Sequence, residues 1–480
     1  MRTFFTFALL ALLPLGLLRA EESEFPEPTN RGDASRMGKD IQRTMTLLAT
    51  STPEQKNTVT ILLYGQSITA GKWGIYLEEH LRETYPDANL IYVRKPLSGF
   101  ASHLLSKTSE FDMYPVYPDL VIFHDLGNDK DYETMIRNLR ERTTAEVIIQ
   151  ADHLRRNQKV IDESDPAKVK DRSQQISAFR NYRFLPEVAR KYGCAFDARR
   201  DLWKDYLREH NLEPGVMVAD HVHPNEHGTY LMTELIKAYL VKREDVKIDP
   251  MNCGYVTTIP VTEDMRTDDG ALQYQFDGNR IDVIFSKDAT QACAAQIDGA
   301  QPLDIPAMRY HGRNRVKWRG TPIPPGPWPA VLKVGFEQPL IDESWTLTAT
   351  QDQADPKLYL FEVRGSKTGA DGSGRTDQRF VSNSGRVVIE PDDWEIKFAI
   401  TDLRRLKELP SEFELNWTVM KQATNDVTPP KAKKGVERAV TVAQLLTDEK
   451  HTLILTGGIE GVRALRIYSP SKFPCPANGN

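Results

Sequence analysis

The stretch from Thr58 to Val241 alternates short apolar runs with longer helical patterns, and this alternation constrains the fold more than any other feature. The expected strands are Val59–Tyr64, Asn89–Val93, Leu120–His124, Val147–Gln150 and Cys194–Asp197, and the expected helices are Trp73–Tyr85, Tyr132–Arg142, Arg172–Tyr192 and Gly228–Val241. Strands that alternate with helices predict βαβ units and one parallel sheet. We assign this α/β domain to residues 56–245.

The chain before this domain has two parts. Arg2, an apolar run from Phe4 to Leu18, and Ala20 before two glutamates have the order of a secretory signal peptide, so residues 1–20 predict export to the periplasm or the medium. The alternative is an uncleaved membrane anchor, but the run is short for a bilayer span of about 20 residues. Residues 21–55 are polar, with a helix expected at Lys39–Ala49.

Residues 250–480 are rich in strand patterns separated by Gly, Asp and Pro, which predicts one or two β-sandwiches. The expected strands include Leu272–Phe276, Arg280–Phe285, Ala330–Val334, Leu358–Val363 and Arg386–Ile389. A proline cluster at 320–330 is the expected division, and Arg364–Gly385 is expected to be a long loop. Trp318 and Trp328 flank the prolines and are candidates for stacking on sugar rings, whereas most tryptophans at strand spacing are core residues.

Charge and cysteine content exclude several function classes. The 480 residues carry a formal net charge of −5, which argues against a nucleic-acid-binding protein and against a polybasic membrane-surface protein. After the N-terminal run, no stretch is long and apolar enough to predict membrane insertion. Four cysteines suit an oxidising compartment, and the sequence leaves their pairing open, as it leaves the oligomeric state.

The first chemical motif is Gly65-Gln66-Ser67-Ile68-Thr69, directly after the first expected strand. The carboxyl ends of parallel strands are where α/β folds bind ligands, so Ser67 is a candidate nucleophile. The alternative is that Ser67 only caps a helix.

The second motif is Asp220-His221-Val222-His223-Pro224-Asn225, before the last expected helix. With a spacing of three residues, Asp220 can accept the Nδ1–H of His223, which leaves Nε2 to take a proton from a serine. His221, His223 and His227 offer an alternative zinc set. The acids of Asp125–Asp131 suggest calcium, but they lack the EF-hand spacing.

Two further positions follow expected strands on the same rim. Gly99 follows the second strand, and Asn128 follows the third. The backbone N–H groups of Ser67 and Gly99 and the side-chain amide of Asn128 would together supply an oxyanion hole. The alternative is that both loops are ordinary turns.

These elements, in this order, resemble the SGNH (GDSL-like) hydrolase family over about residues 56–245. The resemblance implies a flavodoxin-like three-layer α/β/α fold and ester hydrolysis, with Ser67, His223 and Asp220 as the triad and Ser67, Gly99 and Asn128 as the oxyanion donors. Two positions depart from the family pattern. Gln66 replaces the usual acid of Gly-Asp-Ser, and Leu126-Gly127-Asn128-Asp129 shifts the glycine of Gly-x-Asn-Asp by one residue.

A signal peptide, an SGNH-like domain and a β-rich region together resemble exported carbohydrate esterases. We therefore expect a serine-dependent esterase that removes acetyl groups from a polysaccharide or oligosaccharide and needs no metal or organic cofactor. Two alternatives remain open: a lipase or thioesterase with the same triad, and a carbohydrate-binding protein on an inactive SGNH scaffold.

Overall fold

The computed structural model describes residues 24–317, 328–402 and 408–473. The predicted signal peptide, Trp318 and most of the proline cluster therefore lie outside the described residues. Among the residues it does describe, no helix combines the length and apolar character needed to cross a bilayer.

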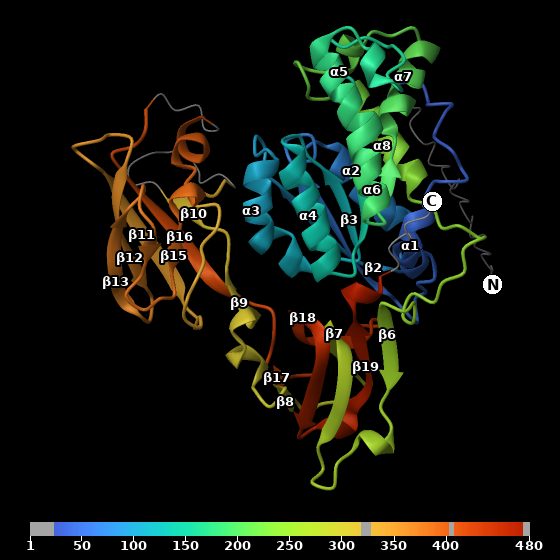
Figure 1. The fold of residues 1–480 in the computed structure, drawn as a ribbon. Helices are drawn as coiled ribbons and strands as arrows, with labels where there is room; N and C mark the ends of the chain where they lie inside the picture. The colour runs from blue at the N-terminus through green and yellow to red at the C-terminus, as the bar shows by residue number, and fades with distance from the viewer. Residues whose placement is uncertain (1–23, 318–327, 403–407, 474–480) are drawn as a thin grey trace, which may run out of the picture.

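The α/β domain contains one five-stranded parallel sheet in the order β2-β1-β3-β4-β5 (Figure 1). The strands are β1 (Thr58–Gly65), β2 (Asn89–Pro96), β3 (Leu120–His124), β4 (Glu146–Gln150) and β5 (Ala195–Asp197). This strand order is that of the flavodoxin-like doubly wound fold. The predicted α/β class is confirmed, and all five predicted strands form.

Helices cover both faces of this sheet, so the domain has three layers. One face carries α1 (Gln42–Ala49), α2 (Trp73–Thr84), α7 (Arg199–Glu209) and α8 (Glu226–Tyr239). The other carries α3 (Ser102–Asp112), α4 (Asp129–Arg142) and α6 (Leu185–Lys191). The predicted helix Arg172–Tyr192 consists of α5 (Arg172–Phe179), a π-helical turn and α6. The sequence patterns missed α3 and α7.

The first β unit contains residues 256–300 and 422–473, from two distant parts of the chain. Its antiparallel sheet has the order β17-β8-β18-β7-β19-β6. The strands are β6 (Val256–Pro260), β7 (Leu272–Phe285), β8 (Cys293–Ile297), β17 (Asp426–Val427), β18 (Arg438–Thr456) and β19 (Val462–Tyr468). The two strands predicted at 272–276 and 280–285 are the two halves of β7.

The inserted β unit, residues 309–421, lies between β8 and β17 in the sequence. Its main sheet contains β9 (Arg309–His311), β10 (Arg315–Lys317), β11 (Ser344–Gln351), β12 (Tyr359–Gly365), β13 (Gly369–Arg375) and β16 (Glu412–Lys421), and a small sheet pairs β14 (Phe380–Val381) with β15 (Val388–Ile389). The strands on either side of the proline cluster, β10 and β11, belong to the same sheet, with β16 between them. Antiparallel sheets throughout this region agree with the predicted β-sandwich class.

Two expectations in the inserted unit were wrong. Arg364–Gly385 is not one long loop, because β13 pairs with β12 inside it. Its glycines misled the prediction: a Cβ at Gly374 would lie 2.7 Å from the ring of Phe361, so the strand needs glycine to fit beneath an aromatic side chain. Ala330–Val334 is not a strand either, although Val331 is buried and makes an isolated bridge to Trp394.

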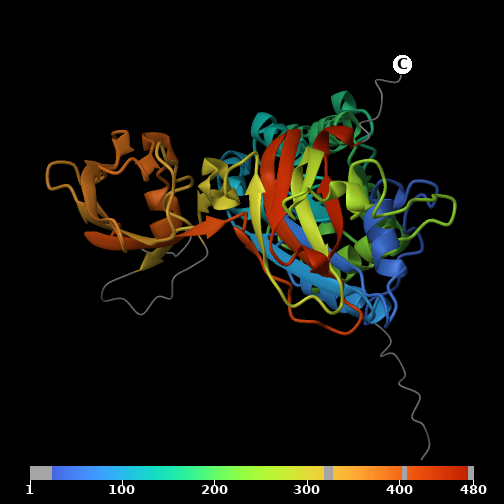
Figure 2. The same cartoon turned by 90° about the horizontal axis from the view of Figure 1, so that it is seen from below.

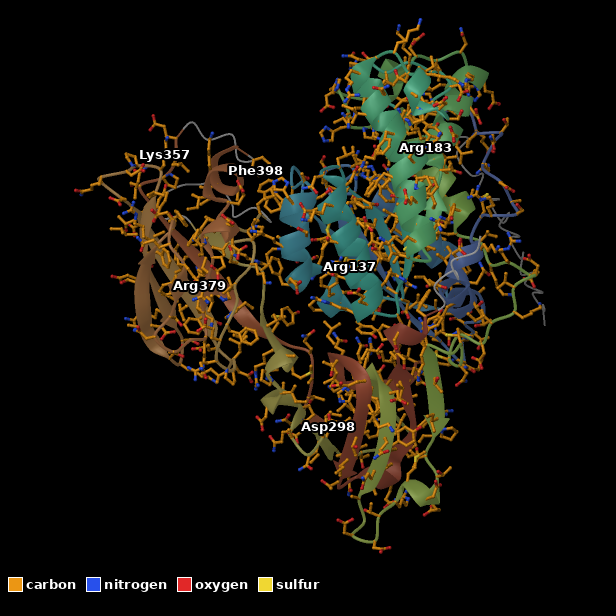
Figure 3. The ribbon with its side chains drawn as sticks, viewed as in Figure 1. Arg137, Arg183, Asp298, Lys357, Arg379 and Phe398 are labelled. Carbon is orange, nitrogen blue, oxygen red and sulfur yellow. The ribbon has the colours of Figure 1, made fainter. Side chains whose placement is uncertain are left out.

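The two β units lie against different sides of the α/β domain. The first β unit lies below the domain in Figure 1, and the inserted unit lies to one side, next to α3, as Figure 2 confirms. The interface with α3 includes an ion pair between Lys107 Nζ and Asp393 Oδ1 at 2.8 Å. Phe398, labelled in Figure 3, has its ring centroid 5.9 Å from that of Phe100. The inserted unit is therefore fixed against the α/β domain by both apolar and charged contacts.

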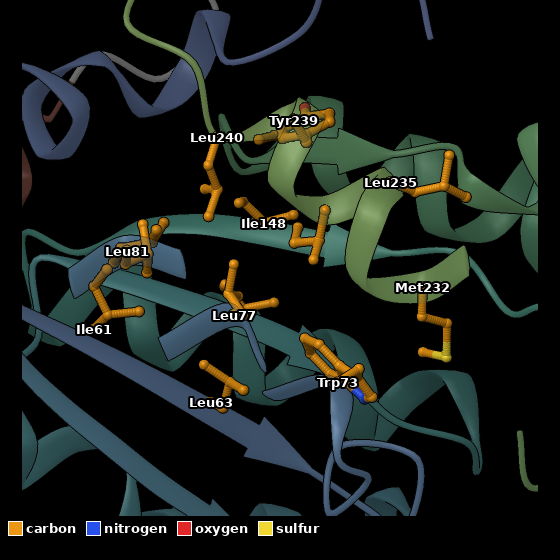
Figure 4. Packing of buried hydrophobic residues seen from close by; sticks show 14 of the residues in the cluster. Ile61, Leu63, Trp73, Leu77, Leu81, Ile148, Met232, Leu235, Tyr239 and Leu240 are labelled. Carbon is orange, nitrogen blue, oxygen red and sulfur yellow. The ribbon is translucent and has the colours of Figure 1, made fainter. Parts of the chain in front are cut away.

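Alternate residues of β1 enter the two apolar cores of the domain. Ile61 and Leu63 point to the α2 and α8 side, where they share one apolar core with Leu77 and Leu81 of α2 and with residues of α8 (Figure 4). Tyr64 points to the opposite core, under α3. Because both faces of the strand are fully covered, β1 is rigid up to its carboxyl end, where the first chemical motif begins.

Candidate active site

Ser67 lies in the turn between β1 and α2, at the carboxyl end of the sheet. Gly65, two residues before Ser67, has φ +149°, and a Cβ there would lie 1.9 Å from the His124 carbonyl oxygen. Only glycine therefore allows the chain to leave β1 this closely beside β3. The N-cap position of α2 is Lys72, five residues further on. The helix-cap explanation of Ser67 is therefore excluded, and its side chain is available for chemistry.

His223 contacts both predicted partners. Its Nε2 lies 2.8 Å from Ser67 Oγ, and its Nδ1 lies 2.7 Å from Asp220 Oδ2. An ionised carboxylate only accepts hydrogen bonds, so Nδ1 carries the proton and Nε2 is left to accept the hydroxyl proton of Ser67. The structure thus brings together the three residues predicted as the triad, from loops 153 residues apart in the chain.

Asp220 is held as an ionised carboxylate by the backbone of its own loop. Its Oδ1 accepts the N–H groups of Val222 and His223, each at 2.8 Å. These hydrogen bonds, that of His223 first, hold the pKa of Asp220 well below its usual range. The pair is open to solvent, with side-chain exposures of 44% for His223 and 58% for Asp220. The loop geometry, not burial, therefore fixes the imidazole.

A basic side chain that the sequence analysis missed holds this loop from behind. The Arg156 guanidinium donates to the carbonyls of Asp220 at 2.7 Å, Val218 at 2.8 Å and Ala219 at 3.2 Å. The backbone N–H of Arg156 donates to the backbone carbonyl of His221 at 3.0 Å. No local pattern signals this role, because Arg156 lies in the long connection after β4 and meets the loop only in the folded chain.

A second histidine supports the same loop. His153 Nε2 donates to Val222 O at 2.6 Å, and burial lowers the pKa of His153 to about 3, which keeps its imidazole neutral. Beyond the loop, Asn225 caps α8, because its Oδ1 accepts the N–H of Gly228 at 3.0 Å. The loop that carries Asp220 and His223 is thus held by Arg156 and His153, and Asn225 caps the helix that follows it.

Gly99 lies in a tight turn after β2. Phe100 N–H donates to Leu97 O at 3.0 Å, and Leu97 N–H donates to Gly65 O at 2.8 Å, which ties this turn to the end of β1. Gly99 has φ +83°, a value that suits the third residue of a type II turn and favours glycine. The turn therefore stands next to the Ser67 turn, with Gly99 exposed at its tip.

Asn128 is the N-cap of α4. Its Oδ1 accepts the N–H of Asp131 at 2.8 Å, and its amide Nδ2 donates to the Asp131 carboxylate at 2.5 Å. The amide has a second N–H, because an asparagine side chain carries two donors. The structure thus gives Asn128 a structural function, and its predicted contact with an oxyanion stays a prediction.

The two departures from the SGNH pattern lie in the same part of the structure. Gln66 Nε2 donates to Leu126 O at 2.5 Å, a bond that the carboxylate of an ionised aspartate could not make. A Cβ at Gly127 would lie 2.4 Å from the backbone nitrogen of Ser102, so glycine there lets the loop approach α3. Both departures therefore shape the contact of the loop after β3 with its neighbours.

The remaining histidines of the second motif point elsewhere. His227 Nε2 lies 2.7 Å from the Tyr206 hydroxyl, and its ring stacks on Phe25 at 4.3 Å. His221 is exposed and contributes its carbonyl to Arg156. In the described part of the chain, no three His, Cys, Asp or Glu side chains are grouped as a metal site would require.

The tryptophans of the β-rich region divide as follows. Trp345 and Trp417 are buried core residues with ring centroids 6.5 Å apart. Trp328 is partly buried, and its Nε1 donates to Ser98 O at 2.8 Å, next to Gly99. Trp318 lies outside the described residues. Of the two predicted sugar-stacking residues, Trp328 therefore borders the candidate site.

No protein-family model matches the sequence, and no curated protein matches it. Among solved structures, the chain is similar to an α/β hydrolase from the Lake Arreo metagenome (17% identity, TM-score 0.32, 39% of this chain and 97% of that one). It is also similar to a protein described as a putative GDSL-like lipase from Parabacteroides merdae (16% identity, TM-score 0.32, covering 39% of this chain and 98% of that one). A third similar structure is the acetylxylan esterase Axe2 from Geobacillus stearothermophilus (18% identity, TM-score 0.31, covering 39% of this chain and 96% of that one).

Within the chain itself, the strand order of the domain and the three residues in contact at its carboxyl edge are those that the SGNH resemblance predicts.

Proposed function

We propose that this protein is a serine-dependent carboxylic ester hydrolase. The observation that carries the proposal is the unbroken hydrogen-bond chain from Asp220 through His223 to Ser67. Ser67 Oγ attacks the acyl carbonyl while His223 Nε2 takes its proton, and Asp220 stabilises the imidazolium that forms. The imidazolium then protonates the departing alkoxide, and a water activated by the same imidazole releases the acid.

The negative charge on the tetrahedral intermediate needs donors on the other side of the carbonyl. We propose the backbone N–H groups of Ser67 and Gly99 for this role, with the Asn128 amide as the third donor. The ties between the Ser67 turn, the Gly99 turn and the loop after β3 support this assignment, because they hold the three loops together at one edge of the sheet.

As substrate we propose acetyl esters of a polysaccharide or oligosaccharide. The exposure of His223 and Asp220 supports this choice. A short acyl group on a bulky, polar chain needs an open site, whereas a long acyl chain gains its affinity from an apolar groove that removes it from water. We also propose export, on the strength of residues 1–20, and the N-terminal sequence of protein recovered from the periplasm or medium would test it.

The decisive assay measures acetate released by the purified protein from a panel of acetylated polysaccharides, beside p-nitrophenyl esters of increasing chain length. We expect acetate release and a kcat/KM that falls from acetate to octanoate, both absent in Ser67→Ala. A preference for octanoate would identify a lipase-type enzyme. Binding of the polysaccharides without turnover would favour the inactive-scaffold alternative.

A further inference from the structure

The inserted β unit reaches the α/β domain at the turn that holds Gly99. The Trp328 indole N–H donates to the carbonyl oxygen of Ser98 at 2.8 Å. At the last residue of the same turn, Phe398 packs on Phe100, with ring centroids 5.9 Å apart. Figure 3 shows Phe398 on the side of the inserted unit that faces α3. Two aromatic side chains of the insertion therefore contact one four-residue turn of the candidate active site.

The bonded carbonyl belongs to the peptide group whose N–H is the predicted oxyanion donor. Leu97–Phe100 is a β-turn closed by the Phe100 N–H, and the Ser98–Gly99 peptide is its central unit. That unit can face either way in a β-turn, and this orientation is what separates type I from type II. In a trans peptide the C=O and N–H point in opposite directions, so a bond that fixes Ser98 O also fixes the direction of the Gly99 N–H.

We propose that Trp328 is a positioning residue for the oxyanion hole, acting through the Ser98–Gly99 peptide. The proposal rests on the proposed esterase function. It makes the inserted β unit a part of the active site instead of a separate appendage. Because the Ser98 carbonyl accepts the indole N–H, the bond also draws electron density toward that carbonyl and strengthens Gly99 N–H as a donor.

The indole is itself held at a fixed place. Trp328 packs against apolar residues of both the α/β domain and the inserted unit. Four residues later, Leu332 is 2% exposed within the core under α3 and α4. The Arg313 guanidinium contacts the Asp112 carboxylate at 2.5 Å and ties the insertion to α3. A donor on such a rigid support holds the peptide without reorganisation when charge develops on the substrate.

The test compares Trp328→Phe with Lys107→Met. The first keeps an aromatic ring and deletes the N–H, whereas the second breaks an ion pair of the same interface that includes no residue of the turn. We expect Trp328→Phe to lower kcat for an acetyl ester about tenfold with KM within twofold, because the donor acts mainly in the transition state. Lys107→Met should leave both kinetic constants within twofold.

Hydrogen–deuterium exchange of the peptide covering residues 97–101 provides a readout that does not depend on activity. Trp328→Phe should speed exchange there, and Lys107→Met should not. Unchanged exchange, or faster exchange with unchanged kcat, would overturn the proposal. A raised KM with intact kcat would also overturn it and would make Trp328 a substrate-binding residue. If the unsubstituted protein lacks esterase turnover, the proposed function fails, and the exchange data still show whether Trp328 orders the turn.

Discussion

The two sides of the candidate site are built differently. On the proton-relay side, Ser67, His223 and Asp220 are in direct contact, and the loop that carries the last two residues closes on itself through its own backbone. On the oxyanion side, the Gly99 turn and the Asn128 loop are shaped by partners distant in the chain. Short-range geometry therefore sets the contact between Asp220 and His223, although Arg156 and His153 also support that loop. The proposed oxyanion donors depend on long-range packing throughout.

This difference predicts which substitutions should lower activity on each side of the candidate site. Loss of a relay residue removes a chemical step, whereas the oxyanion side can be perturbed from another body of the molecule, as at Trp328. Within the α/β domain, Arg180 is a further distant partner of the Asn128 loop, since its guanidinium donates to Asp125 O at 2.9 Å and contacts the Asp129 carboxylate. Graded substitutions on both sides test the comparison.

The largest effect is expected on the relay side. Ser67→Ala and His223→Ala should each lower kcat for an acetyl ester by at least about 10⁴-fold with the fold intact, because triad residues act as a unit. His221→Ala, two residues away and exposed, is the matched control and should retain most activity. If His221→Ala proved the more damaging of the two histidine variants, the relay assigned to His223 would be wrong.

The next effect concerns Asn128. Asn128→Ser keeps an N-cap acceptor for α4 and deletes the amide, so it should lower kcat about 10²-fold at unchanged thermal stability. Asn128→Ala should show the same loss of kcat and in addition lose about 1 kcal/mol of stability, because the cap is gone. Full activity in the serine variant, with destabilisation only in the alanine variant, would restrict Asn128 to its capping role.

A smaller effect is expected at Arg156, which acts only through the loop. Arg156→Ala removes three hydrogen bonds to loop carbonyls, and a displaced His223 should lower kcat about tenfold with little change in KM. Arg156→Lys should retain more of the kcat than Arg156→Ala but less than the wild-type protein, because an ammonium does not reproduce the planar donor geometry of the guanidinium. Arg208→Ala, at an exposed ion pair, is the control. Equal kinetics for the two alanine variants would show that the loop holds itself.

The fold of the α/β domain could be predicted because its strands are short apolar runs buried on both faces. Helix α3 could not, since it buries Thr108, Ser109 and Asp112 among its apolar residues and so lacks an amphipathic pattern. Its Asp112 is tolerated because Arg313, from the inserted unit, lies against it. The strand β13 was missed for a different reason, because its glycines are typical of a loop although the strand pairs with β12.

The site divides in the same way. Asp220 and His223 lie three residues apart, so their contact follows from one loop, and the position of Ser67 follows from the end of a strand. Arg156 leaves no local pattern, and Trp328 could be predicted only as a sugar-stacking residue, because each meets its partner across 62 residues or more of chain. The contacts that hold a site in place are thus less visible in a sequence than the residues that carry its chemistry.

The pKa of an aspartate is shifted in opposite directions on the two sides of the site. Asp220 is exposed and its pKa is lowered by backbone N–H groups, so its contribution to stability is present above its unfolded pKa and is lost as the pH falls below it. Asp125, on the oxyanion side, is 2% exposed, and burial raises its pKa from 3.8 to about 7. Its contribution is complete below the unfolded pKa and is lost as the pH rises through about 7.

The last prediction uses this raised pKa. Between pH 5 and 6 the folded protein keeps a proton on Asp125 that the unfolded chain has released, so this group should lower the free energy of unfolding by about 1.4 kcal/mol per pH unit. The decrease per pH unit becomes smaller toward pH 7, where Asp125 itself ionises. Asp125→Asn replaces the neutral acid by an amide of the same shape. Urea unfolding at pH 5, 6 and 7 should show that the free energy of unfolding of this variant falls less steeply with pH, by that amount.

Glu146, whose pKa burial also raises to about 7, is present in both proteins and cancels in the difference. Asp245→Asn is the control, because the Arg243 ion pair lowers the pKa of Asp245 and keeps it ionised in this range. Identical slopes for the wild-type protein and Asp125→Asn would mean that Asp125 is ionised in the folded protein, and that the oxyanion side carries a buried negative charge.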